Sequence, residues 1–296
     1  MTAQSLPKSL LGLPAPAKLN LFLHVIGQRE DGKHLLESIF VLVDLADTID
    51  LTLREDGVIA RTGDLCCDAE HDLCVRAARL LQSHTDIALG ANIAVTKRIP
   101  AGAGMGGGSS DAATVLIGLN RLWKLDLPVR ELARLGEQLG ADVPFFIHGQ
   151  NAFVEGIGER ITPLPVPTGT YALIWPGRSV STAKIFASPF LTRNSESLKI
   201  TVFSDFLRNL WPELPGRNDL QSVAIKLEPA ISDALEALIP LGGEPRMTGS
   251  GSAVFTLVRE GSEDVQPFLE KLPSGTRFFF LKGLPEHPLR VWTRES

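Results

Sequence analysis

The sequence Pro100-Ala101-Gly102-Ala103-Gly104-Met105-Gly106-Gly107-Gly108-Ser109-Ser110-Asp111 contains five glycines within seven residues. It follows a strand pattern and opens a strongly helical one. Glycines have no Cβ, so this backbone can turn tightly and approach a ligand closely. Ser109, Ser110 and Asp111 are expected at the start of the helix, where free amides and the helix dipole favour an anion. The stretch therefore predicts a phosphate-binding loop at a helix N-terminus.

Three other interpretations of the loop are weaker. A plain turn whose Ser and Asp cap a helix would not need so many glycines. Gly102-x-Gly104-x-x-Gly107 fits the dinucleotide-binding pattern, but Asp126 follows between two predicted helices, so the required strand–helix–strand unit does not close. The P-loop motif requires a lysine after the glycines, where this chain has Gly108.

The composition is that of an ordinary globular protein and argues against polyanion binding. The chain has 296 residues, of which 44% are hydrophobic and 21% charged, so we expect two domains or one large α/β unit. Its 29 basic and 34 acidic residues give a net charge of −5. No general basic field exists to attract nucleic acid or an anionic membrane. Backbone amides and a few placed cations must therefore hold any phosphate-bearing ligand.

Cysteine usage and the N-terminus indicate a cytoplasmic protein. Cys66, Cys67 and Cys74 are odd in number and crowded together, which favours a reducing compartment with inert thiols over a disulfide framework or a zinc site. The first residues contain no continuous apolar core of a signal peptide. The longest apolar runs are far too short to cross a membrane, so no membrane partner is expected.

Hydrophobic periodicity predicts interleaved strands and helices, and hence an α/β or α+β fold of two domains. Alternation over 16–27 predicts a strand that carries Lys18 and Asn20 on the face opposite its apolar one. The dense Pro/Gly stretch at 163–169 predicts a domain boundary. Helices are expected over 73–83, 109–123, 129–139 and 222–239. Strands are expected over 39–43, 47–53, 91–98, 171–175, 253–258 and 277–282.

The glycine loop, with Ala112-Ala113-Thr114 after it, resembles the ATP-binding loop of the GHMP kinases, the superfamily of galactokinases, homoserine kinases, mevalonate kinases and phosphomevalonate kinases. More narrowly, five segments in order along the chain resemble the diphosphocytidyl methylerythritol kinase family of the non-mevalonate isoprenoid route. They are Pro16-Ala17-Lys18-Leu19-Asn20-Leu21, Asp31-Gly32-Lys33-His34, the glycine loop, Leu139-Gly140-Ala141-Asp142-Val143-Pro144-Phe145-Phe146 and Met247-Thr248-Gly249-Ser250-Gly251-Ser252-Ala253-Val254-Phe255.

The resemblance implies a two-domain kinase with its active site in the cleft between the domains. Residues 1–165 would form the ATP-binding domain, and residues 166–296 would shape the substrate site. The implied reaction is ATP-dependent phosphorylation of the 2-hydroxyl of 4-diphosphocytidyl-2-C-methyl-D-erythritol. The alternatives are another kinase of the homoserine or mevalonate type, a non-catalytic nucleotide-binding protein and a Rossmann oxidoreductase. The oligomeric state is open between a monomer and a weak homodimer.

Two residues are implied to carry the chemistry. Without the resemblance, Asp142 would be interpreted as a turn or cap residue and Lys18 as a solvated lysine on a strand. The resemblance makes Asp142 the catalytic aspartate and Lys18 its neighbouring cation. A cation within about 4–6 Å would keep the aspartate ionised. It would also offset charge that develops during phosphoryl transfer, while Asp142 orients the hydroxyl.

The resemblance assigns the cytidine end of the substrate to Asn20, His34, Thr182 and Phe186. His34 can bond a pyrimidine edge and Phe186 can offer a stacking face, whereas the residues alone suggest a surface histidine and a core phenylalanine. The family usually has an aromatic residue where this chain has Lys33. Half of a two-ring sandwich around cytosine would then be missing.

The nucleotide is assigned to the loop, with Asp72 and Lys97 near the adenosine. Asp72 stands where the family commonly has Asn; an ionised Asp only accepts hydrogen bonds, so the amine of adenine would have to donate to it. No dedicated metal cage is expected, because Mg²⁺ would be carried mainly on the ATP phosphates with help from Ser109 or Ser110. The phosphate-binding residues are Pro100, Ala101, Gly102, Ala103, Gly104, Met105, Gly106, Gly107, Gly108, Ser109 and Ser110.

Two later features have less defined roles. The motif Thr248-Gly249-Ser250-Gly251-Ser252 is either a turn at the entry to a strand or a second backbone wall beside the substrate diphosphate. Asp219, in Asn218-Asp219-Leu220, is interpreted as a helix cap or a catalytic group.

Overall fold

A long antiparallel hairpin forms the centre of the fold. The computed structural model describes residues 8–64, 68, 70–259 and 269–293, so Cys66 and Cys67 lie outside the described residues. Strands β1 (Ser9–Gln28) and β2 (His34–Arg54) pair over nearly their whole lengths. The two strands predicted over 39–43 and 47–53 are one strand, because a shift of register absorbs residues 44–45 as a bulge without ending β2.

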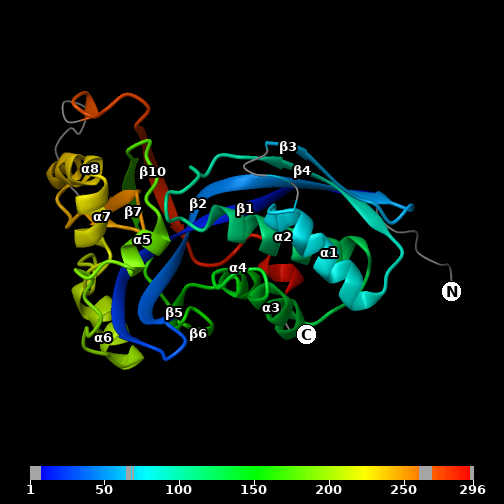
Figure 1. Ribbon diagram of the computed structural model, residues 1–296, viewed down its shortest axis with the longest axis horizontal. Coiled ribbons are helices and arrows are strands. Elements are labelled where there is room, and N and C mark those ends of the chain that lie inside the picture. Colours follow the sequence, from blue (N-terminus) through cyan, green and yellow to red (C-terminus); the bar gives the residue numbers. More distant parts are fainter. Residues whose placement is uncertain (1–7, 65–67, 69, 260–268, 294–296) are drawn as a thin grey trace.

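The N-terminal half builds a sheet around this hairpin and covers one face with helices (Figure 1). β4 (Gly90–Thr96) pairs with β2, and β3 (Ile59–Gly63) lies parallel to β4. β5 (Ala152–Gly156) pairs with β2 and with β6 (Arg160–Pro163). The covering helices are α1 (Leu73–Thr85), α2 (Gly107–Leu122), α3 (Val129–Glu137) and α4 (Val143–His148).

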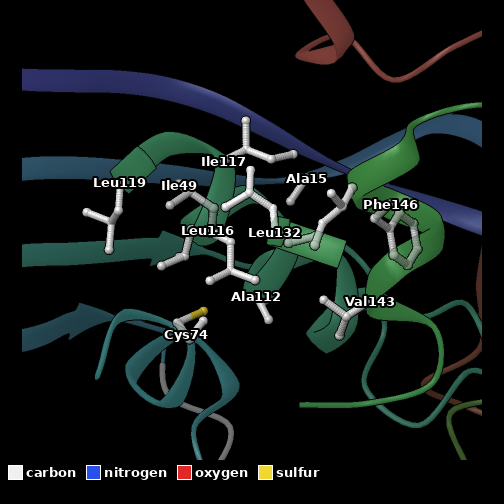
Figure 2. Close-up of a cluster of buried hydrophobic side chains, with 14 of the residues drawn as sticks. Ala15, Ile49, Cys74, Ala112, Leu116, Ile117, Leu119, Leu132, Val143 and Phe146 are labelled. Atoms are coloured by element: carbon white, nitrogen blue, oxygen red, sulfur yellow. The ribbon is translucent and has the colours of Figure 1, made fainter. Parts of the chain in front are cut away.

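Helix α2 lies at the middle of the N-terminal core. Figure 2 shows Leu116 of α2 among side chains from β2, α1, α3 and α4, including Ile49, Leu132 and Phe146. Cys74 is buried in the same core, and burial raises the pKa of its thiol, as expected for an inert cysteine. Because α2 is apolar on nearly every side, packing fixes its position, and with it the loop that enters it.

The C-terminal half continues the same sheet. Its strands are β7 (Thr170–Trp175), β8 (Arg246–Met247), β9 (Val254–Leu257) and β10 (Arg277–Leu284). Its described helices include α5 (Thr182–Phe186), α6 (Ile200–Leu210), α7 (Gln221–Leu227) and α8 (Ala230–Leu238), and two short 3₁₀ turns are η1 (Ile239–Leu241) and η2 (Arg290–Trp292). Within the described residues the main strand order is β3-β4-β2-β10-β7-β9-β8.

The two halves share a core at their junction. Strand β10 pairs with β2 on one side and with β7 on the other. Phe22 of β1, Met105 of the glycine loop, and Tyr171 and Phe255 of the C-terminal half belong to one buried cluster. The boundary expected at 165/166 falls between β6 and β7. In the part of the chain that the structure describes, no helix is both long and apolar enough to span a membrane.

Candidate active site

The helix behind the glycine loop begins two residues earlier than the sequence predicted. α2 starts at Gly107 instead of Ser109, with Gly106 at its cap. Ser110 and Asp111 are therefore buried in the body of the helix. Glycine is tolerated in the first turn because burial against the core, rather than helix propensity, stabilises α2. The first intrahelical bond is donated by the amide of Ser110 to Gly106, so the amides of residues 107–109 have no partner within the helix.

The loop conformation depends on glycine at alternate positions. Gly102, Gly104 and Gly106 have φ values of +67°, +75° and +72°, a region that is costly for residues with a Cβ. A Cβ on Gly104 would lie 2.3 Å from the carbonyl oxygen of Thr248, and one on Gly249 would lie 2.6 Å from that of Gly104. The two glycine motifs thus touch, and neither tolerates a side chain at the contact.

Hydrogen bonds also join the late glycine motif to the loop. The amides of Ser252 and Ala253 donate to the carbonyls of Gly102 and Ala103 at 3.2 Å. The side chain of Asn218 donates to two carbonyls within and beside the motif at 2.8 Å. The motif is therefore a turn at the entry to β9 that supports the glycine loop, and its Gly249 and Ser250 also line the cavity that contains Lys18 and Asp142.

Asp219 does not cap a helix, so that interpretation was wrong. Helix α7 has Leu220 at its N-cap and no capping bond from a side chain; the amide of Leu220 donates to Oδ1 of Asn218 at 2.9 Å in the turn before the helix. Asp219 instead accepts from the amide of Val25 at 2.8 Å and pairs with Arg217 at 2.8 Å. The carboxylate is buried against β1, so it satisfies a strand amide and fixes β1 beside the segment that enters α7.

Lys18 and Asp142 lie together beneath the glycine loop, as the resemblance implied. Nζ of Lys18 is 3.9 Å from Oδ2 of Asp142 and donates to the carbonyl of Gly104 at 3.0 Å and to Oδ1 of Asn20 at 2.5 Å. Burial lowers the pKa of Lys18, and Asp142 opposes this shift. The side chain of Asp142 is 31% exposed and makes no capping bond within the described residues. Its carboxylate is therefore available to a ligand.

Three cavities adjoin one another around this pair. The loop cavity, about 410 Å³, follows the glycine loop. The central cavity, about 260 Å³, contains Lys18 and Asp142 and shares Gly104 and Gly106 with the loop cavity. The outer cavity, about 830 Å³, contains His34 and shares Phe186 with the central one. The central cavity thus lies between the other two.

An ion pair lies at one end of the loop cavity. Asp72 caps α1 by accepting from the amides of Cys74 at 2.7 Å and Val75 at 3.3 Å. Its second oxygen accepts from Nε of Arg61 at 3.0 Å, and both side chains are more than nine-tenths buried. The charge of Asp72, which stands where the family commonly has Asn, is therefore balanced by the guanidinium of Arg61. The sequence did not indicate this ion pair.

Lys97 is held by two buried acids. Its Nζ lies 2.6 Å from Asp111 and also bonds Asp47. The other oxygen of Asp47 accepts from the amides of Arg98 at 2.5 Å and Ile99 at 2.9 Å, so it anchors the entry to the loop. Burial raises the pKa of Asp111 to about 7. Burial would lower the pKa of Lys97, but the two carboxylates raise it to about 12.

The outer cavity contains a direct stack of His34 on Phe186. The ring centres are 4.7 Å apart with an angle of 26° between the planes. One face of Phe186 is therefore covered by the histidine. Thr182, at the start of α5, shares a hydrogen bond of 2.7 Å with Ser250 of the late glycine motif. Lys33 lies beside His34 on the cavity wall.

Every site residue predicted from the sequence lines one of these cavities, with the exception of Ser110, whose side chain is fully buried in α2. The residues that sequence reasoning missed are those that hold the predicted ones in place. They are Asp47 behind the loop, Arg61 beside Asp72, and Arg193 beside His34. Each lies outside any motif, so only the folded chain brings it to the site.

Comparison with known proteins assigns the class. The models of the GHMP kinase N-terminal domain and C-terminal domain match residues 72–150 and 202–274. The homoserine kinase of Cytophaga hutchinsonii has the same fold, with a TM-score of 0.69 over 97% of this chain and 98% of that one, at 20% identity. The fold is that of a GHMP kinase.

Closer relatives narrow the class to one family. The 4-diphosphocytidyl-2-C-methyl-D-erythritol kinase of Variovorax paradoxus is 47% identical over 96% of this chain and 99% of that protein. The same kinase of Aromatoleum aromaticum is 49% identical over 96% of each. A crystal structure of a 4-(cytidine 5′-diphospho)-2C-methyl-D-erythritol kinase matches with a TM-score of 0.75 and 34% identity, over 93% of this chain and 98% of that one. The chain belongs to the 4-diphosphocytidyl-2-C-methyl-D-erythritol kinase family.

Proposed function

We propose that the chain transfers the γ-phosphoryl group of ATP to the 2-hydroxyl of 4-diphosphocytidyl-2-C-methyl-D-erythritol. The observation that carries this proposal is the order of the cavities. The glycine loop lies on one side of the Lys18–Asp142 pair, and a cavity with stacked rings lies on the other. This order suits a nucleoside triphosphate as donor and an acceptor that is itself a nucleotide conjugate.

The donor would occupy the loop cavity. Its phosphates would meet the amides of residues 107–109, where the helix dipole favours negative charge. The adenosine would extend toward the Arg61–Asp72 pair, where the exocyclic amine can donate to the carboxylate. The charge of Lys97 is already shared between Asp47 and Asp111, so this lysine supports the loop and contributes little free charge to the phosphates.

The reaction would take place in the central cavity. The acceptor oxygen forms a bond to the γ-phosphorus while the bond from that phosphorus to the β–γ bridging oxygen breaks, and ADP leaves. Asp142 orients the hydroxyl and takes its proton as the new bond forms. Lys18 pairs with Asp142 at 3.9 Å and would offset charge on the transferred group. In a loose transition state, this orientation matters more than early removal of the proton.

The residues around the loop fit a Mg²⁺ ion that stays mainly on the nucleotide. Mg²⁺ keeps several waters and binds phosphate oxygens with one or two protein oxygens. Ser109, which lines the loop cavity, would supply such an oxygen. Among the described residues there is no cluster of three or more acidic, histidine or cysteine side chains that would form a separate cage. When bound, the ion would neutralise charge on the β- and γ-phosphates.

Competition between acceptors tests the proposal. Radiolabelled ATP is offered with the diphosphocytidyl alcohol, homoserine and mevalonate, and Asp142→Asn serves as the inactive control. We expect label on the diphosphocytidyl alcohol alone. Comparable labelling of homoserine or mevalonate would indicate another GHMP kinase activity. ATP binding without turnover of any of the three would indicate a nucleotide-binding protein.

A further inference from the structure

Arg193 contacts the outer cavity's histidine, and the reaction above gives it no role. It lies in the loop that follows α5. Its guanidinium donates to the carbonyls of Phe186 at 2.7 Å, Ser188 at 2.9 Å and Leu191 at 3.2 Å. Because carbonyls at the end of α5 and in the loop after it hold the guanidinium, its orientation does not depend on His34.

One of the two remaining donors of Arg193 determines which nitrogen of His34 carries the proton. Nε of Arg193 donates to Nε2 of His34 at 3.0 Å. A guanidinium only donates and stays charged, so Nε2 must present its lone pair. A neutral imidazole then carries its single proton on Nδ1. Burial and the charge of Arg193 both lower the pKa of His34, so the ring remains neutral at neutral pH.

The ring is also held in place. His34 stacks on Phe186, and Phe186 is the residue whose carbonyl Arg193 binds. The three residues therefore form one unit, of which His34 and Phe186 line the outer cavity. Rotation of the imidazole would break both the stack and the bond to the guanidinium.

A fixed tautomer makes Nδ1 a donor, and a donor discriminates between the two common pyrimidines. Cytosine has a lone pair at N3, whereas uracil has an N–H at the same position. A donor that meets N3 therefore pairs with cytosine and leaves two opposed hydrogens with uracil. Leaving a polar group unpaired at a desolvated contact costs much more than the bond itself contributes. A histidine free to exchange tautomers would adapt to either base.

We propose that Arg193 is a positioning residue that sets the pyrimidine specificity of this kinase: by holding His34 in the Nδ1-protonated tautomer, it makes the outer cavity select cytosine over uracil. The inference rests on the proposed function, because it places the cytidine end of the acceptor against His34. Arg193 acts through the histidine and does not itself contact the substrate.

Nitrogen-15 NMR of labelled histidine in the full chain tests the tautomer directly. The chain has six histidines, and comparison with His34→Gln assigns the signals of His34. In the ligand-free wild type we expect a protonated Nδ1 and an unprotonated Nε2. In Arg193→Met we expect the proton to be distributed between the two nitrogens. Protonation of wild-type His34 on Nε2, or on both nitrogens, overturns the proposal.

Kinetics with the cytidine and uridine forms of the diphosphate alcohol test the specificity. Wild type should prefer the cytidine form, and Arg193→Met should lower the cytidine-to-uridine ratio of kcat/KM by about tenfold, mainly through KM. Arg193→Lys keeps the positive charge but lacks the planar set of guanidinium donors. The same ratio is measured on this variant if Arg193→Met does not fold. Arg208→Met, on the exposed face of α6, is the matched control and should leave the ratio unchanged.

The outcomes separate the two proposals. An unchanged ratio in a folded Arg193 variant, or equal use of both pyrimidines by wild type, overturns the role of Arg193 while leaving the kinase assignment intact. Absence of turnover with both forms in wild type rejects the proposed function, and the specificity inference with it.

Discussion

Nζ of Lys18 lies 3.9 Å from Oδ2 of Asp142, and this pair joins β1 to the start of α4 directly beneath the glycine loop. The lysine is almost completely buried, whereas the aspartate is partly exposed to the central cavity. The geometry therefore presents a carboxylate to a ligand and keeps its counter-charge inside the protein. In the proposed reaction, the phosphoryl group is transferred at this point.

The first prediction concerns Asp142. Asp142→Asn should lower kcat by about 10²–10⁴-fold, because the amide neither takes the proton nor carries the charge that pairs with Lys18. ATP affinity should stay within a few-fold, since the loop cavity lies on the other side of the pair. Steady-state kinetics and a nucleotide titration measure the two quantities. Asp205→Asn, on exposed α6, is the control, and a kcat of Asp142→Asn near that of the control would contradict the assignment.

The second prediction concerns the pH dependence of turnover. Burial lowers the pKa of Lys18, so its ammonium loses the proton at a lower pH than a solvated lysine does. Since the charged form is the active one, kcat should fall as pH rises through that lowered value. Lys18→Arg keeps its charge throughout this range, so in this variant the fall of kcat, the alkaline limb of the pH profile, should occur at a higher pH. A pH profile whose alkaline limb is the same in wild type and in an active Lys18→Arg would show that the limb belongs to another group.

The third prediction concerns the contact between the two glycine motifs. Gly104→Ala should reduce both stability and ATP affinity, because the new Cβ would lie 2.3 Å from the carbonyl oxygen of Thr248. Gly12→Ala is a matched control: Gly12 also has a positive φ, of +70°, but nothing lies within 4 Å of its Cβ position. Backbone strain alone should cost the control about 1–2 kcal/mol.

Urea unfolding and a nucleotide titration of both variants separate strain from collision. Gly104→Ala should lose more unfolding free energy than Gly12→Ala and should be the only one of the two to bind ATP weakly. Equal losses in both variants would mean that the contact with Thr248 contributes nothing beyond the backbone conformation.

The fourth prediction concerns the buried pair of acids around Lys97. Burial raises the pKa of Asp111 to about 7, so between pH about 4 and about 7 the folded chain binds more protons at this site than the unfolded chain. This site therefore makes stability fall as pH rises through that window. Asp111→Asn removes the titration, so its stability relative to wild type should rise over the same window by a few kcal/mol. Urea unfolding across this pH range measures the difference in unfolding free energy between the variant and wild type. For the control Asp205→Asn we expect this difference to be constant with pH. A constant difference for Asp111→Asn as well would contradict the prediction.

The sequence predicted most of the site because local signals carry its main parts. The glycines of the loop, the strand that bears Lys18 and the segment around Asp142 are each contiguous, and each lines the cavity expected of it. The helix start was misplaced because glycine at 107 disfavours a helix in isolation, whereas the folded core holds α2 in place regardless.

The parts that the sequence did not predict depend on long-range contacts. Arg61 balances the charge of Asp72, and Arg193 orients His34, although neither arginine belongs to a motif. For Asp219 a local role was predicted and the actual partner is distant. Its position before a helix suggested a cap, whereas its carboxylate accepts from the amide of Val25 on β1. Such partners are determined by the packing of distant segments.

The most direct test of the account is the structure of a ternary complex with a non-hydrolysable ATP analogue and the diphosphocytidyl alcohol. We expect the triphosphate along residues 102–109, the 2-hydroxyl within hydrogen-bond distance of Asp142, and the cytosine against His34 in the outer cavity. A cytosine bound on the glycine loop, or an acceptor hydroxyl remote from Asp142, would contradict it.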